Sequence, residues 1–321
     1  MDNRGCKQTL STTIDPYKNP YVSSAISDST SCFGLSDGEI SNIEVKTNGQ
    51  IQLDTLMNKR NEIFIPLLKE YTKNNYDSII RSKYPWAPFI PYSFAEYGNS
   101  KPSVFYIGID TYYWGTKPED LIMAYNSNDY SLLFSKNDNV VTPERILKKW
   151  SYSKGPFWEF LCKMQLFFKD QRLRSTSDLR SLSIEEQKSI YEIGYGNANL
   201  LELPKTLEKE EYWESIDKED YWRMIEGVKS IFSPIKNILD SFKPDIIIVL
   251  GADISDEYLF KDLNYCHHKD FDEGKWRKLY SVENYDVKVI KTYHPNAFWR
   301  QRSNNDEMVE YLYESLKLFE S

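Results

Sequence analysis

The chain has 321 residues, of which 40% are hydrophobic, so it is long enough to bury a full core. No apolar run approaches the ~20 residues that a membrane span needs, and the sequence MDNRGCKQTL lacks the apolar stretch of a secretory signal, so we expect a cytoplasmic protein. The formal net charge of -8 excludes a surface that is basic throughout, although DNA binding needs only one basic face.

The first fifty residues are rich in Ser, Thr, Asn, Asp and Gly, and their apolar residues are too sparse to show a period. We interpret residues 1–50 as a polar, flexible N-terminal extension, and residues 51–321 as a single α/β domain. Within it, residues 51–100 form a helical lead-in, because apolar residues recur at helical spacing from position 53 to 76, with Pro66 as an irregularity. Residues 102–321 form the core that carries the motifs.

Three short apolar runs, at residues 103–110, 245–251 and 285–293, are typical of buried strands, and a fourth strand is expected near residues 195–203. Strands that alternate with helices predict a mainly parallel central β-sheet flanked by helices on both faces, a three-layer αβα arrangement. The helical patterns span residues 142–150, 157–168, 220–242 and 304–319, with one more helix near residue 253.

Two chemically active residues stand where strands of this sheet end. Asp110 closes the first strand, and His294 follows the 285–293 strand within the sequence His-Pro-Asn. Each signal is weak alone, because an acid at a strand end often caps a turn and a loop histidine often bonds locally. Ligands of parallel sheets bind at the carboxyl ends of the strands, so the two together predict one active site.

Four motifs, in chain order, resemble those of the uracil-DNA glycosylase superfamily. GIDTY at residues 108–112 is similar to the first family motif, Gly-x-Asp-Pro-Tyr, and HPN at residues 294–296 is similar to the last. GPFW at 155–158 resembles the segment that places an aromatic ring under a flipped base. GNANLLELP at 196–204 resembles the strand whose Asn recognises the base edge. The match runs roughly from residue 102 to the C-terminus.

The resemblance implies a uracil-DNA-glycosylase-like fold and a monofunctional DNA glycosylase that flips a pyrimidine base out of DNA. Hydrolysis of the N-glycosidic bond then leaves an abasic site. The bond breaks through a cationic sugar, so Asp110 would orient a water toward C1′ and stabilise the sugar. His294 would stabilise the negative charge on the departing base, which a neutral imidazole that donates a hydrogen bond can do.

The base-binding residues implied by the same motifs are Gly108, Tyr112, Phe157 and an asparagine. Phe157 is the stacking candidate. Asn199 is the first candidate for base recognition and Asn197 is the alternative, because an amide offers a donor and an acceptor to uracil or, if rotated, to cytosine. Plain packing of Phe157, and amides that bond their own backbone, remain open.

After the His motif the family carries an apolar side chain that fills the gap left by the flipped base, and Phe298 stands at this position. An apolar wedge flanked by cations that contact phosphates suits the run AFWRQR at residues 297–302. A helix start that buries Phe298 and Trp299 is the alternative. Basic clusters at residues 145–154 and 169–174 are candidates to extend the phosphate contacts. The expected DNA contacts are Asn296, Phe298, Trp299, Arg300, Arg302 and Lys154.

The sequence departs from the family at Thr111, which replaces the Pro and loosens the backbone beside Asp110. Tyr112 matches the residue that screens out C5 substituents in strict uracil enzymes, whereas the insertion at residues 113–154 can reshape the pocket. The expected substrate is therefore uracil or a hydroxymethylated or glucosylated cytosine of phage DNA, in base-excision repair or antiviral defence. The alternative is a non-catalytic DNA-binding module on the same scaffold. A third possibility is an unrelated α/β hydrolase in which Asp110 and His294 serve a small substrate.

The four cysteines form no Cys-x-x-Cys pair, so we predict free thiols without a disulfide, zinc or iron-sulfur site. Cys266, His267 and His268 are adjacent, but adjacent side chains rarely converge on one ion, and we interpret them as a solvated loop. We expect no metal and no cofactor. DNA is the expected partner, with no membrane contact, and we expect the protein to be a monomer.

Overall fold

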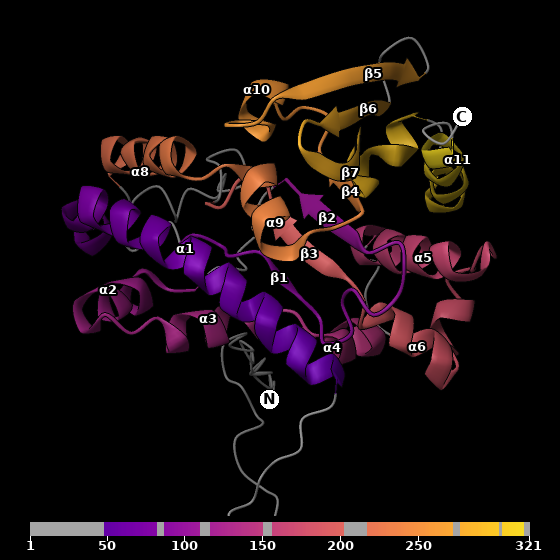
Figure 1. Cartoon of the computed structure of the whole chain (residues 1–321), viewed down its shortest axis with the longest axis horizontal. Helices are drawn as coiled ribbons and strands as arrows, with labels where there is room; N and C mark the ends of the chain where they lie inside the picture. Colours follow the sequence, from indigo (N-terminus) through magenta and orange to yellow (C-terminus); the bar gives the residue numbers. More distant parts are fainter. Residues whose placement is uncertain are drawn as a thin grey trace, which may run out of the picture. The chain divides into compact units, whose positions relative to one another are not determined.

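The computed structural model describes residues 48–81, 87–109, 116–149, 156–201, 217–271, 277–301 and 304–317 (Figure 1). The chain divides into two units, residues 1–45 and residues 46–321, and the described residues all belong to the second unit. The fold below is therefore that of the second unit alone.

Seven strands of the described residues join in one sheet. The strands are β1 (Tyr92–Ser93), β2 (Val104–Gly108), β3 (Gly194–Asn197), β4 (Ile246–Leu250), β5 (Tyr265–Phe271), β6 (Arg277–Val282) and β7 (Tyr285–Thr292). They lie in the order β1-β3-β2-β4-β7-β6-β5 (Figure 1). The four neighbours β3, β2, β4 and β7 are parallel, whereas β1 pairs antiparallel with β3, and β6 and β5 extend the other edge antiparallel.

The fold is thus α/β with a mixed sheet, which is parallel at its centre and antiparallel at both edges. The strands predicted at residues 103–110, 245–251 and 285–293 are present as β2, β4 and β7, because their apolar runs are buried on both sides. The strand expected near residues 195–203 is shorter, since β3 ends at Asn197 and residues 198–201 are not strand. The hairpin of β5 and β6 was not predicted, because Cys266, His267 and His268, which were interpreted as a solvated loop, lie on β5 among residues 265–271. They carry charged and histidine side chains, since this strand lies at the exposed edge of the sheet.

Helices cover both faces of the sheet. Alternate residues of β2 show this, since Val104 and Tyr106 pack in one hydrophobic cluster with α5, α6 and α11, whereas Phe105 and Ile107 pack in another with α9 and α10. None of the described helices is long and apolar enough to cross a membrane. The helices are α1 (Asn48–Arg81), α2 (Pro118–Ser127), α3 (Ser131–Asp138), α4 (Pro143–Lys149), α5 (Pro156–Asp170), η1 (Asp178–Arg180), α6 (Ile184–Ile190), α8 (Lys218–Ile231), α9 (Pro234–Phe242), α10 (Asp256–Leu259), η3 (Pro295–Gln301) and α11 (Asn305–Lys317).

The predicted lead-in helix is α1, which extends beyond its apolar period at both ends. It continues without interruption through Pro66 and through Asn75, whose backbone is non-helical. Its buried face packs in a third hydrophobic cluster with α2, α3 and α8. The single helix predicted over residues 220–242 is two helices instead. The break falls at Ser233, because Pro234 starts a new helix and cannot donate to the preceding turn.

Candidate functional site at the carboxyl ends of the parallel strands

The ends of three parallel strands bring the described site candidates to one edge of the sheet. Gly108 ends β2 and pairs in register with Asn197, which ends β3. His294 follows the end of β7 by two residues, and β4 separates β7 from β2. Because the four strands are parallel, their carboxyl ends share this edge.

A continuous set of contacts links these residues. The His294 ring stacks on Phe157 with 5.3 Å between ring centroids and 12° between planes. Phe157, in the first turn of α5, meets Tyr195 of β3 edge-on at 5.6 Å. The Tyr195 hydroxyl in turn donates a hydrogen bond to Asn197 Oδ1 at 2.8 Å. The site thus joins the ends of β2, β3 and β7 to the start of α5.

His294 is held as a neutral imidazole. Burial lowers its pKa from the ordinary value of 6.5 to about 4, because the charged form loses hydration. The backbone N–H of Asn296 donates to Nδ1 at 3.2 Å. A nitrogen that accepts a hydrogen bond in the neutral ring is unprotonated, so the proton is on Nε2. His294 therefore offers one N–H donor at neutral pH.

Phe157 is half-buried in an aromatic cluster. Its ring meets Trp158 edge-on at 5.3 Å, and Trp158 lies 5.2 Å from Tyr195 between ring centroids. One face of Phe157 is partly covered by His294. The sequence candidate for stacking lies beside the candidate for charge stabilisation.

Asn197 carries a buried donor that no described residue satisfies. Its side chain is 1% exposed, and Nδ2 has no hydrogen-bond partner within the described ranges, whereas Oδ1 accepts from Tyr195. A buried polar group without a partner costs about 1–3 kcal/mol, and folded proteins rarely leave one. The amide nitrogen is therefore a candidate donor to a ligand.

Gly108 makes room for that amide. A Cβ at this position would lie 2.5 Å from Asn197 Oδ1 and 3.3 Å from the Tyr195 hydroxyl. Real Cβ atoms essentially never approach an oxygen so closely, so any larger residue displaces the amide. Position 108 therefore requires glycine for a steric reason, namely the close approach of the Asn197 amide.

The two candidate asparagines lie in different surroundings. Asn199 is 8% exposed, its backbone N–H donates to the Ile109 carbonyl at 2.9 Å, and it lines a small hollow with residues of α8 and with Tyr258 of α10. Asn197 and Tyr195 share one face of β3, since they are two residues apart on a strand. The structure therefore brings Asn197, the alternative candidate, to Gly108 and Tyr195.

Phe298 does not have the exposure of a wedge, and this prediction is corrected. It is 1% exposed and packs edge-on against Phe160 of α5, 5.4 Å away between centroids, within the main hydrophobic cluster. A side chain that enters a base stack has to reach solvent first. Phe298 is a core residue, as the alternative interpretation proposed. Asn296 is exposed, and its N–H orients His294.

Four candidates lie outside the described residues, namely Asp110, Tyr112, Lys154 and Arg302. For Trp299 and Arg300 only the backbone, within η3, is described. One member of the basic clusters, Arg174, is 3% exposed and pairs with Asp170 and with Glu186 at 2.9 Å. Its charge is neutralised inside the protein, so Arg174 joins α5 to α6 and does not contact phosphates.

Cys266, His267 and His268 lie exposed on β5 at the edge of the sheet. The side chains remain solvated, as expected, although the backbone is a strand; His268 Nε2 lies 2.6 Å from the Ser281 hydroxyl on the neighbouring strand. Within the described ranges, no three His, Cys, Asp or Glu side chains gather as metal ligands would.

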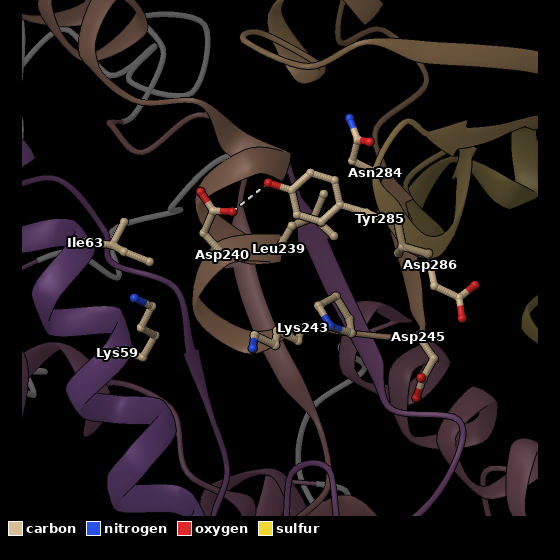
Figure 2. Close-up of a pocket in the computed structure, with 11 residues that line it drawn as sticks. Lys59, Ile63, Leu239, Asp240, Lys243, Asp245, Asn284, Tyr285 and Asp286 are labelled. Atoms are coloured by element: carbon tan, nitrogen blue, oxygen red, sulfur yellow. Dashed lines mark hydrogen bonds between the residues drawn. The ribbon is translucent and has the colours of Figure 1, made fainter.

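A hollow of about 560 Å³ lies at the opposite end of the sheet, between α1, the end of α9 and the start of β7 (Figure 2). Two of its three acidic groups, Asp240 and Asp245, are already engaged. Asp240 accepts from the Tyr285 hydroxyl at 2.7 Å and pairs with Lys236, and Asp245 pairs with Lys101 at 2.8 Å. We place the candidate site at the carboxyl ends because the unsatisfied amide and the neutral histidine are there.

Tyr195 is the site residue that the sequence interpretation missed. It is 2% exposed, packs against Phe89 and Tyr92, and connects Phe157 to Asn197. The signal was present, because Tyr-x-Asn on a strand places both side chains on one face. This signal can be interpreted only when the position at which β3 starts is known.

Comparison with protein-family models, with curated proteins and with solved structures finds no match for this chain. The function is therefore argued from the chemistry of the site itself.

Proposed function

We propose that this protein is a monofunctional DNA glycosylase that flips a pyrimidine base out of DNA and hydrolyses its N-glycosidic bond. We propose also that its sheet and helices form the three-layer fold of the uracil-DNA glycosylase superfamily. The motifs at residues 108–112, 155–158, 196–204 and 294–296 support this proposal, since their described parts converge on one edge of the sheet.

One observation carries the proposal, namely the state of His294. It is neutral, its Nδ1 is occupied by the Asn296 N–H, and Nε2 is left as a donor beside an aromatic ring. A departing pyrimidine gains negative charge, which is shared with its exocyclic carbonyl oxygen, when the glycosidic bond breaks. A preorganised neutral donor at a partly buried position stabilises that charge without transferring a proton.

The reaction divides between two residues. As the C1′–N1 bond breaks, its electron pair leaves with the base, and Nε2–H of His294 donates to the oxygen on which the charge develops. Asp110, two residues beyond the end of β2, stabilises the cationic sugar and orients a water toward C1′. The hydroxyl of that water stays on C1′, and its proton ends on the released base.

The substrate in this proposal is uracil or a C5-modified cytosine, so the cellular role is base-excision repair or antiviral defence. Asn197 recognises the base edge, and Phe157 supports the base by stacking. In this proposal Tyr112 discriminates between the two substrates. A Tyr112 ring packed against C5 of the flipped base leaves room for uracil and excludes a hydroxymethyl or glucosyl group.

The test is release of bases from synthetic DNA. Single-stranded and duplex oligonucleotides that contain uracil, 5-hydroxymethyluracil, cytosine, 5-hydroxymethylcytosine or its glucosylated form are incubated with the purified protein. Hot alkali then cleaves any abasic site. We expect cleavage at one of these bases, and a loss of about 10²-fold or more in rate for His294→Ala, because a single preorganised donor contributes that much.

His268→Ala is the matched control, since His268 is exposed on β5 and takes no part in the site. Absence of abasic sites in every DNA, with binding retained, would identify the protein as the non-catalytic DNA-binding module. Equal rates for His294→Ala and the wild type would remove the role assigned to His294.

A further inference from the structure

The amide of Asn197 has a preferred orientation. Two donors face Oδ1: the Tyr195 hydroxyl at 2.8 Å, and the Cα–H of Gly108, since a Cβ built along a Gly108 Cα–H bond would lie 2.5 Å from that oxygen. If the amide turned over, the Tyr195 hydroxyl, which as a phenol is a better donor than acceptor, would have to accept from Nδ2. On the Gly108 side, Nδ2 would face the Cα–H, and two positively polarised groups would meet. The orientation with Oδ1 on this side is therefore favoured.

The Tyr195 hydroxyl has a fixed position. The side chain is 2% exposed, and four aromatic rings surround it, with centroid distances of 5.2 Å to Trp158, 5.6 Å to Phe157, 5.8 Å to Phe89 and 6.1 Å to Tyr92. Close packing on several sides prevents the ring from shifting to follow a rotated amide. The hydroxyl therefore acts on Asn197 as a rigid partner.

The orientation of an amide decides which pyrimidine edge it accepts. A 4-keto pyrimidine such as uracil presents an acceptor at O4 and a donor at N3–H, whereas a 4-amino pyrimidine such as cytosine presents a donor at N4 and an acceptor at N3. For a base seated in one position, the two edges require opposite orientations of the amide. An asparagine that turns over freely accepts both.

We propose that Tyr195 is the specificity-determining residue of the site: by holding the Asn197 amide in one orientation, it confines base release to one of the two edge types. This inference rests on the proposed function. Tyr195 acts through Asn197 and is a positioning residue, because its hydroxyl is used on the amide. Nδ2, which has no partner within the described ranges, then donates to the acceptor of the selected edge.

The test compares Tyr195→Phe, which removes only the hydroxyl, with the wild type on matched DNA pairs. The pairs are uracil against cytosine, and 5-hydroxymethyluracil against 5-hydroxymethylcytosine. We expect the wild type to release bases of one edge type. In Tyr195→Phe, the ratio of kcat/KM between edge types should fall by at least about tenfold, because the loss of one buried hydrogen bond allows the amide to turn over.

Tyr92→Phe is the matched control. Tyr92 is also a buried tyrosine in the same aromatic cluster, and its hydroxyl donates to the Val141 carbonyl at 3.2 Å. It should lower the melting temperature about as much as Tyr195→Phe and leave the ratio between edge types unchanged. If Tyr195 had a purely structural role, Tyr195→Phe and Tyr92→Phe would change the ratio between edge types to the same extent, or neither would change it.

The possible results separate this inference from the proposed function. A wild type that releases both edge types at equal rates, or a Tyr195→Phe protein with the wild-type ratio, would overturn the inference and leave the glycosylase proposal intact. If no base is released from any DNA, the proposed function fails. Calorimetric titration with free uracil and free cytosine then decides, since the inference requires that one binds and that Tyr195→Phe reduces the difference; no difference would overturn it.

Discussion

At the scale of single residues, the neutral state of His294 makes the stability of the protein depend on pH. Burial lowers the pKa of His294 to about 4, whereas the unfolded chain has the ordinary value of 6.5. Between these values, the unfolded chain binds a proton that the folded protein does not. The neutral His294 therefore adds up to about 3 kcal/mol to the free energy of unfolding above pH 6.5, and this contribution is lost as the pH falls toward about 4.

This pH dependence is measured by urea unfolding at several values between pH 7 and pH 4. The wild type should lose stability faster than His294→Gln over this window, because glutamine does not titrate. Below about pH 4, the two proteins should show parallel curves. Identical slopes throughout would mean that His294 is not held neutral by the fold.

A second residue-scale prediction concerns Gly108. Gly108→Ala puts a methyl group 2.5 Å from Asn197 Oδ1, so the amide has to move. We expect a loss of about 1–3 kcal/mol in the free energy of unfolding, as for other overpacked cores, together with a loss of base release in the protein that remains folded. Urea unfolding and the alkali cleavage assay measure the two effects.

Gly227→Ala is the control for Gly108→Ala. Its Cβ would meet Asn75 Nδ2 at 2.8 Å where α8 lies against α1. It should lower stability and leave base release unchanged. If Gly108→Ala kept the wild-type rate of base release, the contact between Gly108 and Asn197 would have no part in the site.

At the scale of elements, η3 attaches the His294 segment to α5. Phe298 of η3 is 1% exposed against Phe160, so Phe298→Ala removes a buried ring from the main cluster. We expect the free energy of unfolding to fall by about 3–5 kcal/mol, measured in urea. Ile184→Ala, at a residue 75% exposed on α6, should change it by less than about 0.5 kcal/mol. A small effect for Phe298→Ala would restore the wedge interpretation.

The elements that the sequence predicted are those whose patterns report burial directly. The runs in β2 and β4 are apolar at every position because both faces are covered, and this pattern is visible without a structure. The strand β5 has no such pattern, because an edge strand exposes its residues, and so it resembled a loop. The pattern around Phe298 was also ambiguous, because the sequence Phe-Trp-Arg is compatible with a buried turn and with an exposed wedge.

The candidate site was predictable in part. The motif spacing indicated Gly108, Phe157 and His294, and these meet through short contacts with one added residue, Tyr195. The choice between Asn197 and Asn199 was not predictable. It depends on where β3 ends, and strand boundaries are the least certain feature of a sequence.

At the scale of the whole molecule, the hydrophobic clusters of the described residues all belong to the unit that begins at Lys46. A chain that starts at Lys46 should therefore fold by itself. Its melting temperature should differ from that of the full chain by less than about 2 °C, because the three clusters of the described residues are retained. A fall of more than about 5 °C would show that residues 1–45 contribute to the stability of the second unit.

The parallel order β3-β2-β4-β7 also fixes when the site can exist during folding. The sheet assembles the site from residues 108, 157, 197 and 294, so the contacts that join these four parts of the chain are long-range in sequence. Such long-range pairings form slowly and together. A chain still on the ribosome therefore has no complete site until β7 and His294 have emerged.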